Sequence, residues 1–573
     1  MTEPLTLPRR TPQQTTANAG PAGAPTRREY AVITIACTVA SLAAQVWSWR
    51  NHAMLNYGDA VAHLHIARRI FDSHRPGLTQ LGSVWLPLPH LLMLPFVQVY
   101  AWWADGIAGA IPSAVAYVAA CVGLYRLARR WLAPAPAALA LAFFALNPNL
   151  LYLQTTAMDE PLYLCEFIWI AALAVEWRAS LDDNPERSHR LFSLVIAALI
   201  AAVFTRYDGW VIAFLVWVAM TVTLTRLGRL NTRAFWVASI LLAAAPVAWF
   251  AYNAGFFGDW LYFARGPFSA KAIELRTAPP GYPPHPGWHN PWVSLLFFLK
   301  VSELDAAAAA LGNLFLVVSV LGTAWACLSA RRREFAWALL LWIPVPFYAY
   351  AVAYGAVPIF IPAWWPHSWY NTRYGMELLP AMALGLAFAA QIIFALVHQF
   401  TPSAAGRRRR IAAAAALAAL VGFNFAQILR QHPLTYVEST KNLAARRPYD
   451  LAIPPVLRSL LAARPGGVIL MNTSLYPELV SRTGIPLRQT LNESDKEYFK
   501  AALADPAGHA AIVITFDGDD VDRAVKAHPE GLSLVGRFKA KGQPTATIYV
   551  TNVSPGAQSR VNHENLKPVL ASG

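Results

Sequence analysis

Long apolar runs recur along most of the chain, and they determine the fold class that the pattern predicts. A helix that crosses a bilayer needs about 20 mostly apolar residues. We count about eleven such runs, some slightly shorter than this length, at roughly 30–49, 107–125, 132–155, 161–177, 191–205, 209–225, 234–253, 306–330, 335–355, 375–398 and 411–429. The chain is therefore predicted to be a polytopic α-helical membrane protein.

One further apolar run, from Val84 to Ala104, contains three prolines, which break or kink helices. If this run does not cross, every arginine cluster between the later runs lies on the side of Arg27 and Arg28, as the positive-inside rule requires. These clusters fall within 126–130, 178–190, 226–233, 331–333 and 407–410. We therefore interpret residues 51–106 as one large external loop with two surface-lying helices, the second at roughly 88–103.

The first of these loop helices is predicted at 57–71, with its N-terminus at Gly58 and Asp59. One stripe carries Asp59 and His63, and another face is charged, with His65, Arg68, Arg69 and Asp72. Asp59 has two interpretations, which can both hold. It is a carboxylate held at the membrane surface for chemistry, or an N-cap that accepts backbone N–H bonds of the first turn.

After about residue 430 the pattern changes to that of a small soluble domain. Four short runs read as strands, at 467–471, 511–516, 532–535 and 545–550, and helices are predicted at 494–504 and 519–527. We therefore divide the chain into a cytoplasmic tail (1–29), a transmembrane domain (30–430), an external α/β domain (431–553) and a second tail (554–573). The first tail is rich in Pro, Thr, Ala and Gln and is predicted to be disordered.

Composition agrees with a membrane protein, since 56% of the 573 residues are hydrophobic and only 14% are charged. The net charge of +15 does not indicate nucleic acid, because the basic residues sit in short clusters between apolar runs. Such clusters fix orientation and contact anionic membrane lipids. The four cysteines all lie within apolar runs and show no metal-binding spacing.

Several polar segments share the external face under this topology, although their spacing does not require it. Besides the Asp59 helix, they are the acidic corner at 158–161, the corner at 205–209, and the loops 254–300 and 356–374. The loop at 254–300 is rich in Pro and Gly and is predicted to be non-helical. Tryptophan and tyrosine in 356–374 fit an aromatic belt, but His367 and Arg373 do not.

Each corner also has a purely structural interpretation. Asp159, Glu160 and Pro161 suit the first turn of a helix, and Arg206 suits an anchor at the membrane interface. Glu166 lies inside a predicted span. A carboxyl group at such depth is either functional or bonded to a neighbouring helix.

Together these features resemble the GT-C superfamily of integral-membrane glycosyltransferases. The similar features are an uncleaved first span, a loop helix that opens with Gly-Asp-Ala at 58–60, and a Pro-rich element at 84–90. The acidic corner at 158–161, the Thr-Arg-Tyr corner at 205–207, Arg373–Tyr374 and a soluble C-terminal domain are also similar. Within that superfamily, the chain looks similar to bacterial relatives of protein O-mannosyltransferases and of aminoarabinose-type lipid A transferases.

The resemblance implies a sugar donor on a polyprenyl phosphate, used on the periplasmic or extracellular face of the cytoplasmic membrane. The acceptor would be a lipid, a glycan or a protein. The resemblance implies that Asp59, the acidic residue of the first loop, is the catalytic base. A positioned carboxylate can take the proton of an acceptor hydroxyl. Attack opposite the departing phosphate inverts the anomeric carbon. The substrate-binding residues implied are His63, Arg68, Asp159, Glu160, Arg206, His367 and Arg373.

The identity of the cation that meets the phosphate stays open. Arginine holds phosphate in a bidentate geometry, and Arg373, Arg206 and Arg68 are the candidates. Many relatives carry Lys or Arg beside the Pro-rich element, where this chain has only His90. A divalent metal on Asp59, His63, Asp159 and Glu160 is possible in principle. A monophosphate donor makes a metal dispensable, so we expect no cofactor.

Two other functional classes compete with the transferase. A secondary transporter places ionisable groups near mid-membrane on broken helices of two related halves, whereas here they gather at one rim and no paired halves are found. A non-catalytic protein that binds lipid, with the soluble domain as a sensor, is the third interpretation. The position of Asp59 on its surface helix argues against it.

Overall fold

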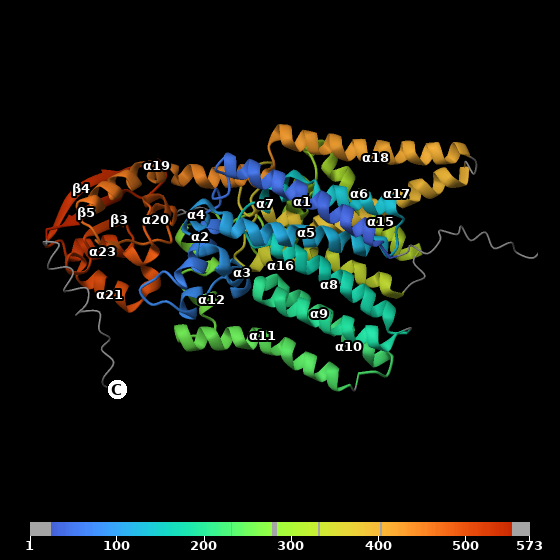
Figure 1. Ribbon diagram of the computed structural model, residues 1–573, viewed down its shortest axis with the longest axis horizontal. Helices are drawn as coiled ribbons and strands as arrows, with labels where there is room; N and C mark the ends of the chain where they lie inside the picture. The colour runs from blue at the N-terminus through green and yellow to red at the C-terminus, as the bar shows by residue number, and fades with distance from the viewer. Residues whose placement is uncertain are drawn as a thin grey trace, which may run out of the picture.

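The computed structural model describes residues 24–182, 184–230, 232–277, 283–329, 333–400 and 404–552. Most of the predicted N-terminal tail, the tail from 554, Arg331, Arg332 and the centre of the Pro-rich loop at 278–282 lie outside the described residues. Within them the chain is mostly helical, with a small sheet near its C-terminal end (Figure 1).

Nine helical segments of the described residues are long and apolar enough to cross a membrane. They run roughly along the long axis of the molecule (Figure 1). Their elements are α1 (Arg27–Arg50), α5 (Ile107–Arg129), α9 (Pro185–Thr205), α10 (Tyr207–Arg226), α11 (Arg233–Phe257), α15 (Ala309–Ser329), η2 with α16 (Arg333–Trp342, Pro344–Tyr354), η3 with α17 (Thr372–Leu378, Leu379–Phe400) and α18 with α19 (Ala404–Gln431, Leu434–Ala462). The predicted membrane fold class is confirmed.

The two remaining predicted spans differ from this set. The run at 161–177 is α8 (Glu160–Ser180), a largely buried helix that carries Glu166 and Glu176. The run at 132–155 is two helices, α6 (Pro134–Ala145) and α7 (Pro148–Leu153). The chain breaks between them because Asn147 caps α7, accepting from the N–H groups of residues 149 and 150.

The first loop contains α2 (Gly58–Arg69), η1 (Leu78–Leu81), α3 (Pro87–Val97) and α4 (Tyr100–Asp105). The prediction of one helix at 88–103 is therefore wrong, because the chain turns at Gln98 and Val99. Arg68 explains the break: its Nη1 donates to the carbonyls of Val97 (2.7 Å) and Gln98 (3.3 Å), which a continuous helix would use itself.

The loop at 254–300 is also more helical than predicted, with α12 (Tyr262–Arg265), α13 (Ala270–Thr277) and the first part of α14 (Pro291–Ala306). The start of α14 has a local cause that composition alone hides. Asn290 accepts a hydrogen bond from the N–H of Val293, and Pro291 occupies the first helical position.

The C-terminal sheet has the strand order β2-β1-β3-β5-β4. Strand β1 (Ile469–Leu470) runs parallel to β2 (Thr490–Leu491) and β3 (Ile512–Phe516), whereas β5 (Ala546–Thr551) is antiparallel to β3 and β4 (Leu532–Phe538). The helical elements of this part are α20 (Glu478–Thr483), η4 (Leu487–Gln489), η5 (Glu493–Asp495), α21 (Glu497–Ala504), α22 (Pro506–His509) and α23 (Asp520–Ala527). The predicted strands are present, and only the two-residue β2 was missed.

Helix α19 joins the two parts of the molecule. It packs against α7 and η3 of the helical bundle and against α20 beside the sheet. Figure 1 shows it in orange, running from the bundle toward the red strands. The residues along α19 therefore contact both parts.

Candidate active site

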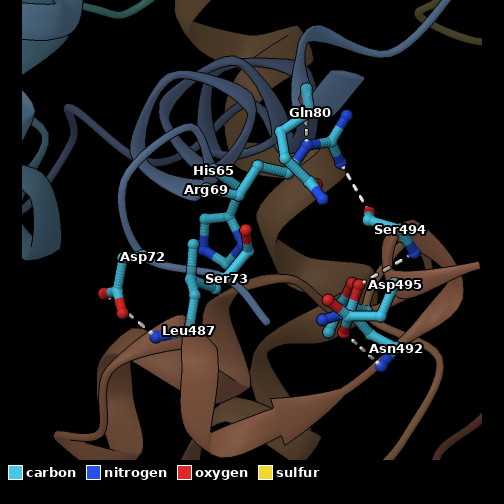
Figure 2. Close-up of a pocket in the computed structure, with 10 residues that line it drawn as sticks. His65, Arg69, Asp72, Ser73, Gln80, Leu487, Asn492, Ser494 and Asp495 are labelled. Atoms are coloured by element: carbon cyan, nitrogen blue, oxygen red, sulfur yellow. Dashed lines mark hydrogen bonds between the residues drawn. The ribbon is translucent and has the colours of Figure 1, made fainter. Parts of the chain in front are cut away.

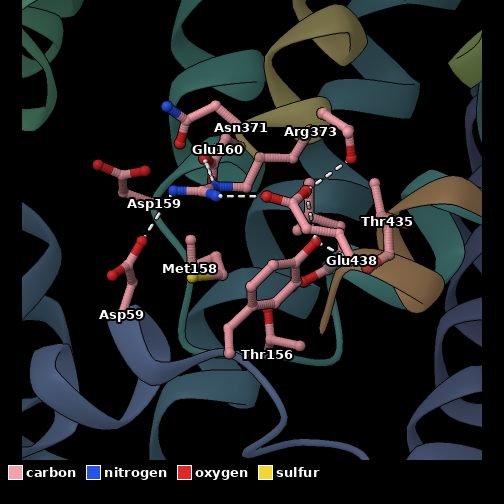
Figure 3. A network of polar contacts seen from close by, with 12 residues as sticks. Asp59, Thr156, Met158, Asp159, Glu160, Asn371, Arg373, Thr435 and Glu438 are labelled. Carbon is pink, nitrogen blue, oxygen red and sulfur yellow. Dashed lines mark hydrogen bonds and ion pairs between the residues drawn. The ribbon is translucent and has the colours of Figure 1, made fainter. Parts of the chain in front are cut away.

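Arg373 is the centre of a polar cluster that joins four elements far apart in the sequence (Figure 3). Its Nε lies 2.7 Å from Glu160 of α8, its Nη2 lies 2.8 Å from Asp59 of α2, and its Nη1 lies 3.3 Å from Glu438 of α19. Just before it, Asn371 has a left-handed backbone (φ 54°), which asparagine tolerates well. This turn starts η3 and places Arg373 inside the bundle.

Asp59 is the accessible member of this cluster. Its side chain is 46% exposed, whereas Glu160 and Glu438 are 1% and 6% exposed. The N-cap of α2 is Tyr57, and Asp59 lies in the first turn. The N-cap interpretation of Asp59 is therefore wrong, because its carboxylate reaches out to Arg373 instead of the backbone of its own helix.

A second arginine, Arg206, organises a neighbouring cluster. It has an extended backbone between α9 and α10, and α10 can start close to α9 because Gly209 has no Cβ to strike the carbonyl of Ala202. Its partners are four carboxylates at 2.9 to 3.4 Å, those of Asp159, Glu160, Asp208 and Glu377. Arg206 is thus a largely buried, ion-paired cation, so its interpretation as an interface anchor is wrong.

The two clusters share two residues. Glu160 contacts both guanidinium groups, and the ring of Tyr374 lies 5.1 Å from each. Six carboxylates meet two guanidinium groups here, from Asp59, Asp159, Glu160, Asp208, Glu377 and Glu438. This excess of acid favours the uptake of a proton or of a further cation.

The described part of the chain contains no set of side chains arranged to bind a metal ion. No group of three or more His, Cys, Asp or Glu side chains is placed to hold an ion there. His63 instead contacts His90, with 2.8 Å between Nδ1 and Nε2, and lies against the ring of Trp85. Burial lowers the pKa of His63 to about 4, although Asp59 opposes this shift, so the imidazole is neutral at pH 7.

The charged face of α2, a helix predicted to lie on the membrane surface, is covered by other parts of the protein. Arg69 donates from Nη1 to Ser494 Oγ (2.8 Å), and Asp72 accepts from the N–H groups of Leu487 and Arg488. A cavity of about 20 Å³ remains in this contact (Figure 2), enough for about one water molecule. The sheet-containing part therefore covers this face of the helix.

Two predicted substrate-binding residues stand apart from the cluster. Arg68 pairs with Asp72 (2.9 Å) on the covered side of α2, and His367 is exposed, with Nδ1 3.0 Å from the carbonyl of Pro362. Glu166 accepts a hydrogen bond from Thr205 of α9 (2.8 Å). This contact agrees with the interpretation of Glu166 as a carboxyl group bonded to a neighbouring helix.

Three members of the clusters were not assigned a role from the sequence. Asp208 was part of the corner at 205–209 but was not singled out, and Glu377 lies in a run treated as a span. A carboxylate within an apolar run is itself a signal, so Glu377 could have been found. Glu438 lies beyond the predicted end of the membrane domain and carried no local signal.

No protein-family model and no curated protein sequence matches this chain. Among solved structures, it is similar to ArnT from Cupriavidus metallidurans bound to undecaprenyl phosphate. The TM-score is 0.51 at 15% identity, and the match covers 92% of this chain and 99% of ArnT. The archaeal oligosaccharyltransferase AglB from Archaeoglobus fulgidus, in complex with an inhibitory peptide and a dolichol-phosphate, gives a TM-score of 0.47 at 10% identity over 85% of this chain and 69% of AglB. The likeness to ArnT concerns the fold, and it confirms the fold expected from the GT-C resemblance.

Proposed function

We propose that this protein is an inverting membrane glycosyltransferase that moves a sugar from a polyprenyl-phosphate donor to an acceptor hydroxyl. The main observation behind this proposal is that the carboxylate of Asp59 is half exposed and lies 2.8 Å from Nη2 of the buried Arg373. One reactive acid is thus presented at the edge of an otherwise buried ionic cluster. The donor class is supported by the shared fold with ArnT, whose structure contains undecaprenyl phosphate.

In the proposed transfer step, one proton moves, one bond forms and one bond breaks. Asp59 takes the proton of the acceptor hydroxyl, and the oxygen attacks the anomeric carbon from the face opposite the phosphate. The bond between this carbon and the phosphate oxygen breaks, and the polyprenyl phosphate leaves with the electron pair. Phosphate leaves readily, so no general acid and no metal are required for this step.

Arg373 is the residue that we assign to the leaving phosphate. Two of its three carboxylate partners are buried, while the third, Asp59, is half exposed. A phosphate can therefore replace Asp59 at Nη2 without disturbing the buried pairs, and this exchange frees Asp59 to contact the acceptor. Charge-assisted bonds from guanidinium to phosphate are strong.

The other clustered residues support Arg373 under this proposal. Glu160 and Arg206 are buried and ion-paired, and Asp159 completes the pairing of Arg206. We place the site on the periplasmic or extracellular face of the cytoplasmic membrane, following the arginine clusters of the sequence. The acceptor is a lipid, a glycan or a protein on that face.

The test is turnover by the purified protein in lipid nanodiscs. A panel of undecaprenyl-phosphate-linked hexoses and pentoses is offered with envelope extract, and release of undecaprenyl phosphate and mass-shifted acceptors is measured. We expect Asp59→Asn to lower the rate about a hundred- to ten-thousand-fold while the protein stays folded, because asparagine is also favourable near a helix start.

Asp182→Asn is the matched control, because Asp182 is an exposed carboxylate in a different loop, paired with Arg178. It is expected to turn over like the wild type. If the Asp59→Asn protein folded and turned over at the wild-type rate, Asp59 would not be the base.

A further inference from the structure

The helix that carries Asp59 begins without a side-chain cap of its own. Its N-cap residue, Tyr57, makes no capping bond, and its hydroxyl donates to the carbonyl of Thr435 (2.7 Å). The first N–H groups of a helix need partners from elsewhere. The N–H of Gly58 donates to Asn442 Oδ1 of α19, at 3.0 Å.

Arg446, one turn further along α19, contacts the same place. Its Nη2 donates to the carbonyl of Asn56 (3.1 Å), and its guanidinium lies against Gly58. A Cβ added at Gly58 would lie 2.3 Å from Arg446 Nη1. A side chain at position 58 would therefore require this guanidinium to shift.

Arg446 is held in turn by the sheet-containing part of the molecule. Its Nη2 lies 2.7 Å from Glu478 Oε1 of α20, and Glu478 is fully buried. Burial raises the pKa of Glu478 to about 7. The contact between α20 and Arg446 thus continues to the residues just before Asp59.

Glu438, Asn442 and Arg446 are spaced four residues apart, so they form one stripe of α19, here called the α19 stripe. Glu438 contacts Arg373 (3.3 Å), while Asn442 and Arg446 contact the start of α2. One helix face therefore contacts both Arg373 and the start of the helix that carries Asp59.

We propose that Asn442 and Arg446 are positioning residues for the transfer reaction, because the α19 stripe sets where Asp59 stands relative to Arg373. The inference rests on the proposed role of Asp59. The accessible edge of the cluster needs such support, because Asp59 has only part of its surface against protein. A displacement of about 1 Å in a reacting group can cost about a hundredfold in rate.

The test compares Asn442→Leu with Asn442→Asp in the nanodisc assay, using the panel donor that the wild type turns over. Leucine is similar in size but accepts no hydrogen bond, whereas aspartate still accepts from the N–H of Gly58. We expect kcat of Asn442→Leu to fall about tenfold or more, towards the hundredfold limit, with the donor KM within about twofold. Asn442→Asp should restore most of kcat, and Arg447→Ala, at the exposed neighbour of Arg446, should change neither constant.

A double-mutant cycle separates this inference from the proposed function. If Asn442 acts through Asp59, Asn442→Leu lowers the residual rate of Asp59→Asn no further. A normal kcat in Asn442→Leu, an equal loss in Asn442→Asp, or additive losses in the double variant would each overturn the inference. Normal turnover by Asp59→Asn would instead overturn the proposed function.

Discussion

The two arginine clusters have similar parts but differ in one respect. Arg373 and Arg206 are both buried among carboxylates and share Glu160 and Tyr374. Every acid around Arg206 is buried or nearly so, whereas Asp59 beside Arg373 is 46% exposed. Under the proposed function, a substrate can displace the half-exposed partner of Arg373, whereas Arg206 has no exposed acidic partner among the described residues.

Under the proposed function, this difference separates a supporting cluster from a reacting one. Burying charges costs several kcal/mol per ion, and only close pairing offsets this cost. The Arg206 cluster meets this condition with four carboxylates, so its removal should affect folding. The Arg373 cluster is open at one edge, so changes there should affect turnover.

The largest expected effect is on stability, from Arg206→Met. This change leaves Asp159, Asp208 and Glu377 buried without their cation, and breaking a buried ion pair costs about 3–5 kcal/mol. Thermal unfolding in detergent, followed by the loss of monodisperse protein, should show a lower Tm and a poor yield.

Arg373→Met is the comparison for this prediction. It leaves only Glu438 buried without its cation, since water can solvate Asp59 and Glu160 keeps its contact with Arg206 (3.4 Å). Its Tm should therefore lie between those of Arg206→Met and the wild type. Equal Tm values for the two variants would contradict the distinction between the clusters.

The sequence predicted much of the site because the key residues lie at element boundaries, where local patterns are informative. Gly58–Asp59 starts α2, Glu160–Pro161 starts α8, and Arg206 separates α9 from α10. The positions of the basic clusters then predicted that these boundaries share one face of the membrane. The pairing of Asp59 with Arg373 lay beyond this reasoning, since 314 residues separate them.

What the sequence could not show comes from long-range packing. The helix α2 was predicted to lie on the membrane surface, but the charges on its polar face contact residues 487–495. Glu438 and Asn442 lie on an unremarkable polar stretch of α19, and their roles depend on where that helix passes. Periodicity describes one element and contains no information on which other element covers it.

The next effect is on turnover, from substitutions at Arg373. A phosphate grip uses the planar guanidinium fork, so Arg373→Lys should keep part of the activity and Arg373→Ala almost none. Loss of a preorganised charge-stabilising donor costs about a hundred- to thousandfold in kcat. The measurement is donor-dependent turnover in nanodiscs, beside Tm.

Arg75→Lys serves as the control, because Arg75 forms an exposed ion pair with Glu497. It should leave kcat near the wild-type value. If folded Arg373→Ala turned over like the wild type, the cation for the phosphate would have to be sought at another residue.

The smallest effect concerns pH and the neutral histidine beside the reacting cluster. Burial holds the pKa of His63 at about 4, against about 6.5 in an unfolded chain. Between these pH values His63 binds a proton in the unfolded chain but not in the folded protein. The free energy of unfolding therefore falls as the pH drops from about 7 towards 4. At pH 5 this one group should cost on the order of 2 kcal/mol relative to pH 8.

His63→Asn removes this titration and keeps a polar atom near the position of Nδ1. Burial also lowers the pKa of His65 and His90, so the variant should keep part of the pH dependence, with a smaller fall in Tm from pH 8 to pH 5. His432→Asn is the matched control, because His432 is exposed and its φ of 62° suits asparagine. An unchanged fall in Tm for His63→Asn would mean that His63 takes up its proton within the fold. The cluster of Arg373 would then gain a positive charge at low pH, and its contrast with the cluster of Arg206 would depend on pH.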